Sequence, residues 1–191
     1  MDAGLAAVLG AAVGAVGTGG AGIVAALLTR SQARSQLKAE YARFIREPRK
    51  AAYAAYVEAA VRDHSKLSEA AVLLKLAAEQ DAGTRTSDRI TRARAAYEVV
   101  DSNTADFEHL YAQVAVEGPE PIIGAAVLLS GALTEYAGQV LACLHSLARD
   151  GNCSSEAIEL LDERHSESYD AYLGFLRRAS EVLGVDGITR A

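Results

Sequence analysis

The sequence predicts an all-α protein: an N-terminal transmembrane helix with a basic stem, followed by an antiparallel, up-and-down four-helix bundle. Three observations predict this fold. Residues 3–28 form an apolar run without a charged side chain, and basic residues cluster directly after it. The rest of the 191-residue chain is rich in alanine and charged residues and poor in glycine, which is a composition that favours helices.

Residues 1–29 are predicted to form the transmembrane helix. The apolar run of 26 residues would span about 39 Å as a helix at ~1.5 Å per residue, more than the ~30 Å core of a bilayer. Its basic residues follow the run, whereas a secretory signal peptide carries them in front. By the positive-inside rule we expect an inner (cytoplasmic) membrane location, with the N-terminus outside and the bundle in the cytoplasm.

Small residues recur at every fourth position of this helix. They are Ala6, Gly10, Gly14, Thr18, Gly22 and Ala26. Because small side chains let helix backbones approach closely in lipid, this small-residue ladder predicts helix association and a homo-oligomer. Residues 17–22 also match GxGxxG, but nothing downstream predicts the parallel sheet that a dinucleotide site requires.

Residues 30–48 are predicted to form a basic juxtamembrane helical stem, and Pro48 is expected to end or kink it. Residues 30–50 hold seven basic residues and two acidic ones. Basic residues beside an apolar span attract anionic lipid headgroups. The expected lipid contacts are Arg30, Arg34, Lys38, Arg43, Arg46, Arg49 and Lys50. Residues 51–191 hold 22 acidic and 12 basic residues, which excludes nucleic acid as a favoured partner.

Residues 49–184 are predicted to form the bundle, with helices over about 49–82, 88–116, 120–149 and 155–183 and a tail at 185–191. Each helix carries one apolar stripe at three-and-four spacing, which indicates a face that packs on partner helices. Short connections place consecutive helices antiparallel. We expect the helix over 88–116 to bend near Asp101.

One pattern in the bundle imitates a di-iron site. Two Asp-x-x-His pairs and two glutamates fall on alternating helices: Asp106 with His109, Asp162 with His165, Glu58 and Glu135. Counting residues back through the antiparallel turns separates Asp162 from Asp106 by roughly 18 Å along the axis. We therefore expect no metal site and no cofactor.

The single histidines and the cysteines give no stronger lead. His64 and His165 fall on or beside buried stripes, where a hydrogen-bonded core histidine is expected, while His109 and His145 are expected at the surface. The cysteines are expected to be reduced in the cytoplasm. No serine or cysteine lies in a nucleophile motif, so we expect no catalytic residues and no enzyme activity.

Three stretches carry a resemblance. They are RKAAYAAY at 49–56, VAVEGPEPIIGAA at 114–126 and YLGFLRRASEVLG at 172–184. With them the chain resembles an uncharacterised actinobacterial family that pairs an N-terminal apolar, membrane-anchor segment with an Ala/Arg-rich helical bundle. The resemblance implies this architecture and this type of host, and it assigns no functional residue.

Three functions follow as hypotheses. The favoured one is a membrane-anchored, self-associating helical bundle that acts as a scaffold or recruits a cytoplasmic protein. The second is a membrane-active effector or small pore assembled through the small-residue ladder. The third is a ligand-binding bundle or an enzyme without a sequence motif. The expected partners of the first are the lipid bilayer, further copies of the chain and an unidentified cytoplasmic protein.

Overall fold

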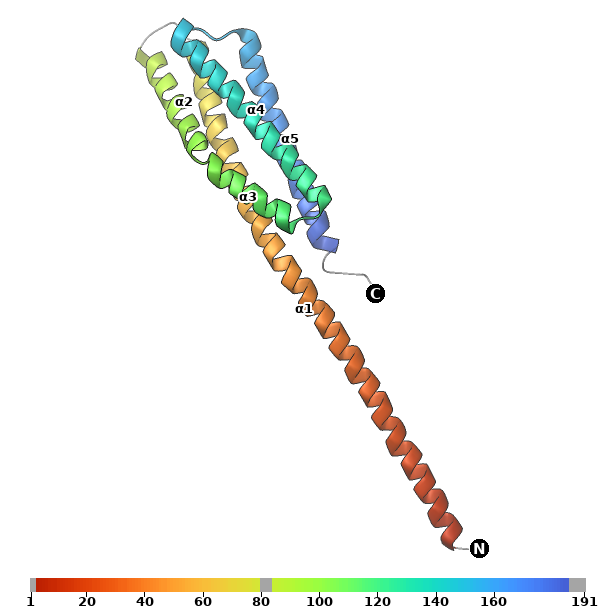
Figure 1. Ribbon diagram of the computed structural model, residues 1–191. Helices are drawn as coiled ribbons and strands as arrows, with labels where there is room; N and C mark the ends of the chain where they lie inside the picture. Colours follow the sequence, from red (N-terminus) through yellow and green to blue (C-terminus); the bar gives the residue numbers. More distant parts are fainter. Residues whose placement is uncertain (1–2, 80–83, 186–191) are drawn as a thin grey trace. The chain divides into compact units, whose positions relative to one another are not determined.

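The computed structural model describes the backbone of residues 3–79 and 84–185. Side chains are described for residues 43–79 and 85–184, and for Gln32, Gln36, Leu37, Glu40 and Tyr41. Within these ranges the chain is all-helical, without a strand (Figure 1). The helices are α1 (Ala3–Ala78), α2 (Thr84–Ser102), α3 (Thr104–Glu117), α4 (Glu120–Asp150) and α5 (Ser155–Val185). The chain divides into two compact units, Met1–Ile45 and Arg46–Ala191.

Helix α1 does not end at Pro48, which lies inside it. The sequence allowed an end or a kink at this residue, and the separate helix expected from residue 49 belongs instead to α1. A proline removes one backbone hydrogen bond and crowds the preceding turn. Good helix formers flank Pro48, and Ala52 and Tyr53 are buried in the next turn. This packing explains why the helix continues.

The helix expected over 88–116 is divided into α2 and α3 at Asn103. The hydroxyl of Ser102 donates to the carbonyl of Val99 at 2.9 Å, a local bond that competes with the regular helix. Asn103 has φ −93° and ψ −1°, and its side chain hydrogen-bonds the buried carboxylate of Asp63 on α1. The break therefore places a polar side chain where it meets a buried acid.

Helices α4 and α5 form the regular part of the unit. Pro121 stands in the first turn of α4, where its missing N–H is not needed. Gly151 ends the helix with φ 68°, a left-handed conformation that glycine adopts without strain. The two helices begin and end within about two residues of the expected ranges.

All five helices contribute to one hydrophobic core, and residues 46–185 form a helical bundle. Tyr56 lies at its centre, fully buried. Its hydroxyl donates to the carbonyl of Ala126 at 2.9 Å and lies 2.7 Å from the hydroxyl oxygen of Ser130, both on α4. Its ring centroid is 5.1 Å from those of Phe107 on α3 and Phe175 on α5. One side chain thus joins four helices.

Among the residues searched in the described part of the chain, α4 is the one helix long and apolar enough to cross a membrane. Length and composition alone are weak evidence, because the core helix of a soluble bundle has the same properties. Nine residues of α4 are buried in the core, which accounts for its apolar character. The spanning helix was expected at residues 1–29 instead, whose side chains lie outside the described part.

Candidate functional site

The residues predicted to associate in lipid lie in α1. Its backbone is helical from Ala3 onward, but the side chains of the small-residue ladder, and those of Arg30, Arg34 and Lys38, lie outside the described residues. Arg43, Arg46 and Lys50 are exposed. Arg49 is half-buried, and its Nε donates to the carbonyl of Glu117 at 2.7 Å. Arg49 is therefore engaged by the end of α3.

The residues of the di-iron pattern are not brought together as a metal site. Asp106, His109 and Glu58 are exposed, and Nε2 of His109 lies 3.0 Å from the amide nitrogen of Gln113. Asp162 pairs with Lys75 instead. Within the part of the chain that the structure describes, no group of three or more His, Cys, Asp or Glu residues is arranged to hold a metal ion.

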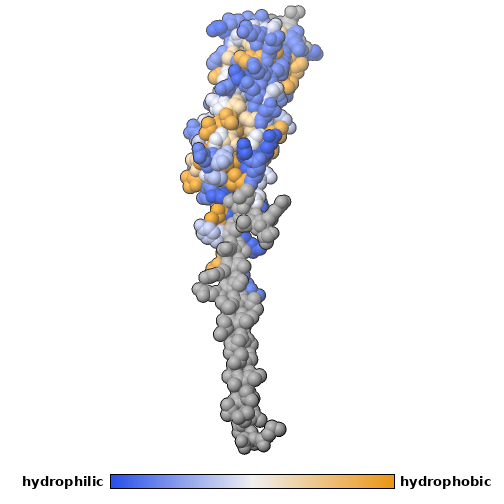
Figure 2. Space-filling model, turned by 90° about the vertical axis from the view of Figure 1, so that its right-hand side faces the viewer, coloured by the Kyte–Doolittle hydropathy of each residue, from blue (hydrophilic) through white to orange (hydrophobic). Residues whose placement is uncertain are grey.

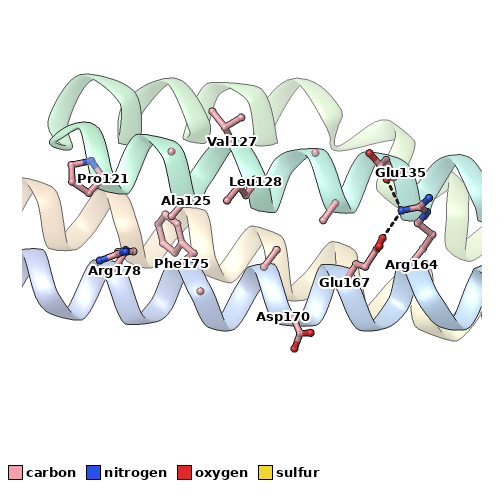
Figure 3. A pocket seen from close by; sticks show the side chains of 15 residues that line it. Pro121, Ala125, Val127, Leu128, Glu135, Arg164, Glu167, Asp170, Phe175 and Arg178 are labelled. Carbon is pink, nitrogen blue, oxygen red and sulfur yellow. Dashed lines mark hydrogen bonds and ion pairs between the residues drawn. The ribbon is translucent and has the colours of Figure 1, made fainter.

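An open groove of about 820 Å³ lies along α4 and α5 (Figure 3). Its floor consists mainly of small residues. They are Gly124, Ala125, Gly131 and Ala132 on α4, and Ala171 and Gly174 on α5. A Cβ atom added at any of the three glycines would meet nothing within 4 Å. The absence of side chains at these positions therefore keeps the groove open.

Large apolar side chains border this floor. Leu128 is 69% exposed and Val127 is 49% exposed, and both line the groove. Figure 2 shows apolar patches interrupting the hydrophilic surface on one side of the bundle. Exposed apolar residues gathered along an open groove, rather than scattered singly, are typical of an interaction surface.

The two ends of the groove differ in charge. At one end the guanidinium of Arg164 lies 2.8 Å from Glu135 and 2.5 Å from Glu167, and these two carboxylates raise its pKa (Figure 3). Arg178 lies at the other end, beside Pro121, and pairs with Glu181 at 2.7 Å. The first end thus has two acidic groups for one basic group, and the second has one of each.

A second cluster lies where α1, α4 and α5 meet. The imidazoles of His64 and His165 are half-buried, with ring centroids 4.8 Å apart. Tyr136 lies against both rings, and Nδ1 of His165 is 3.2 Å from the hydroxyl oxygen of Ser68. The sequence placed both histidines on or beside buried stripes, but it carried no signal that they meet, since they are about a hundred residues apart.

The fold and the groove define a class: a helical bundle with an open apolar groove along two of its helices. Comparison of this chain with protein-family models, with curated proteins and with solved structures found no match. The resemblance to the actinobacterial family therefore stays a prediction, and the function is inferred from the groove, the charge pattern and the N-terminal segment.

Proposed function

We propose that this chain is a membrane-anchored, self-associating helical bundle that acts as a scaffold. A second copy of the chain occupies the groove between α4 and α5. The observation that carries this proposal is the open floor of small residues beside the exposed Leu128. A floor without side chains admits another helix at close range, and the contact removes apolar surface from water.

The residues of the groove match those of a second copy when two α4 helices pack antiparallel. A two-fold axis through Leu128 places Gly124 opposite the partner's Ala132. It also places Ala125 opposite the partner's Gly131. The two leucines then meet on the axis, and the small residues on either side let the helices approach closely. Such an isologous contact uses the same patch on both subunits and closes as a dimer.

The anchoring part of the proposal rests on the first half of α1. Its apolar run carries no charge, its backbone is helical, and exposed Arg43, Arg46 and Lys50 follow it. The proposed placement is the inner (cytoplasmic) membrane, with the N-terminus outside and the bundle in the cytoplasm. The finer architecture proposed is an up-and-down four-helix bundle in which α2 and α3 together form one column. The scaffold would recruit a cytoplasmic protein.

Crosslinking across the proposed axis tests the dimer. Full-length Leu128→Cys in native membranes should form an interchain disulfide under mild oxidation, because the two thiols meet on the axis. Val116→Cys on α3 is the control, since this residue is 83% exposed but lies outside the groove. Both native cysteines are buried and give little background.

A second pair of variants separates groove contacts from contacts through the small-residue ladder. Adding Gly131→Leu should abolish the Leu128→Cys crosslink by filling the floor. Gly138→Leu makes the same change on α4 outside the groove, also in open space, and should leave the crosslink intact. Equal crosslinking at positions 116 and 128 would contradict the proposed interface.

A further inference from the structure

A smaller hollow of about 300 Å³ lies where α1, α2, α3 and α4 meet, beside the break between α2 and α3. Asp63 on α1 is the one charged side chain among the described residues that line it. Leu67 and Leu133 are buried, whereas Thr104 and Thr134 are exposed. The hollow therefore has an apolar interior and opens to solvent beside the two threonines.

The carboxylate of Asp63 is only loosely paired. Nε of the adjacent Arg62 lies 3.4 Å from Oδ1, beyond the ~2.7–2.9 Å of a close charge-assisted hydrogen bond. The side chain of Arg62 is 48% exposed, so water competes for it, and that of Asp63 is 7% exposed. Since Asp63 lines the hollow, its exposed part is reached from there. The carboxylate can therefore accept a closer cation from the hollow.

The surroundings of Asp63 favour such a cation. Burial raises the pKa of the Asp63 carboxyl, although Arg62 and Asn103 oppose the rise. The desolvation of the charged form thus outweighs what these two partners return. A cation bound in the hollow would offset this cost, because opposite charges interact strongly where water is scarce. The hollow is therefore suited to a positively charged ligand and unsuited to an anion.

Two aromatic side chains line the same hollow, Tyr97 on α2 and Phe107 on α3. The faces of such rings attract cations. Burial, with the carboxylate of Asp101, raises the pKa of Tyr97, so its phenol is uncharged near neutral pH and a second acid lies nearby. The rings thus add to the attraction for a cation, and they offer contact to an apolar group attached to it.

The walls distinguish an organic cation from a metal ion. Mg²⁺ and Ca²⁺ take about six to eight oxygen ligands, whereas the described residues contain no group of three or more His, Cys, Asp or Glu arranged to hold a metal. Leu67, Val100 and Leu133 provide apolar contacts instead. An engineered cavity of about 150 Å³ holds benzene, so the 300 Å³ found here accommodates one ring with a short chain.

We propose that this hollow is a binding site for a small organic amine in its protonated, ammonium form. The ammonium group pairs with the carboxylate of Asp63, and the apolar body lies against Tyr97, Phe107 and the leucines. The site is separate from the groove along α4 and α5, and it does not depend on the proposed dimer.

Titration with phenylethylamine tests the proposal. Full-length protein in nanodiscs of a zwitterionic lipid is titrated by calorimetry, with empty nanodiscs as the blank. We expect saturable binding at one site per chain. The uncharged phenylethanol should bind at least about tenfold more weakly, since it lacks the charge-assisted hydrogen bond, and the anion phenylpropionate should not bind. Absence of saturable amine binding, or equal binding of the alcohol, would overturn the proposal.

Matched variants locate the site. Ala137→Leu fills the hollow from α4 and should weaken phenylethylamine binding at least tenfold. Ala142→Leu makes the same change at an exposed position of α4 outside the hollow and should not. If Ala137→Leu does not fold, Thr134→Leu obstructs the hollow from its exposed edge. Unchanged binding in the folded filling variant would overturn the site.

Asp63→Asn tests the ion pair, because it keeps the shape of the side chain and removes its charge. Phenylethylamine should bind this variant at least about tenfold more weakly, whereas phenylethanol should bind it as it binds the wild type. Equal losses for the two ligands, or no loss for either, would show that the charge of Asp63 does not hold the amine.

Arg62→Gln should have the opposite effect. It removes the cation that competes for Asp63, from a half-exposed residue outside the lining of the hollow. Phenylethylamine should therefore bind about two- to fivefold more tightly, the usual worth of an exposed ion pair, with phenylethanol binding unchanged. Amine binding that is unchanged or weaker in this variant would contradict the pairing with Asp63.

Discussion

Helix α5 meets its two neighbours in different ways. Toward α1 it presents rings: His165 lies on His64, and Phe175 lies against Tyr53 and Tyr56. Along its outer edge with α4 it presents Ala171 and Gly174 beside an open groove. The first seam is held together by these ring contacts, and a hollow of about 320 Å³ remains beside His64. The second is left unfilled at the surface, where small residues keep space for another helix.

The comparison predicts that truncating a ring in the seam between α1 and α5 has the largest effect. Tyr56→Ala removes a fully buried ring and its bonds to Ala126 and Ser130. It should lower the free energy of unfolding by about 3–5 kcal/mol, as for other large-to-small core changes. Chemical denaturation followed by circular dichroism measures it.

The matched truncation in the open seam is the control. Leu128→Ala removes an apolar side chain that is 69% exposed. At protein concentrations where the chain is monomeric, it should change the free energy of unfolding by less than about 0.5 kcal/mol, as expected for surface positions. Similar losses from the two variants would mean that the seams do not differ as described.

The next effect in size is a dependence of stability on alkaline pH. Burial raises the pKa of Tyr56 from 10.0 to about 12, although the bond with Ser130 opposes it. Below pH 10 the phenol is protonated in both the folded and the unfolded state, and its contribution is complete. As the pH rises from about 10 to 12, the unfolded state loses the proton first, so folding becomes less favourable by about 2 kcal/mol.

Tyr56→Phe isolates this contribution. The variant lacks the hydroxyl group but keeps the ring, while the other tyrosines remain in both proteins. Its free energy of unfolding should fall less steeply than that of the wild type between pH 10 and 12, as measured by urea denaturation at each pH. Parallel curves for the two proteins would exclude Tyr56 as the group responsible.

Periodicity in the sequence predicted the structural features that depend on local spacing. The stripe on α4, which includes Ile122, Leu129 and Tyr136, is buried, and the all-α fold is confirmed. Spacing could not predict which rings meet, since Tyr56 and Ser130 are separated by 74 residues. It also could not distinguish a covered small residue from an open one, so the groove at Gly124 and Gly131 was not predicted.

The continuity of α1 and the break at Asn103 show that local sequence signals also do not determine where a helix ends. Pro48 is the stronger local signal for a helix end, yet the helix continues through it, where buried Ala52 and Tyr53 follow closely. Asn103 is a weaker local signal, yet the helix breaks there, beside the buried carboxylate of Asp63. Tertiary packing decided both outcomes, and a single sequence does not contain the pairings that produce it.

The last predicted effect has the opposite sign and concerns the open seam. Gly124→Ala and Gly131→Ala each add a methyl group that meets nothing within 4 Å. Glycine inside a helix is less stable than alanine by about 0.5–1 kcal/mol, so each variant should raise the free energy of unfolding by about that amount. Thermal and urea denaturation of the two single variants measure the gain. In the monomeric chain, a loss of stability from either alanine would show that the floor of the groove is occupied by the chain's own side chains.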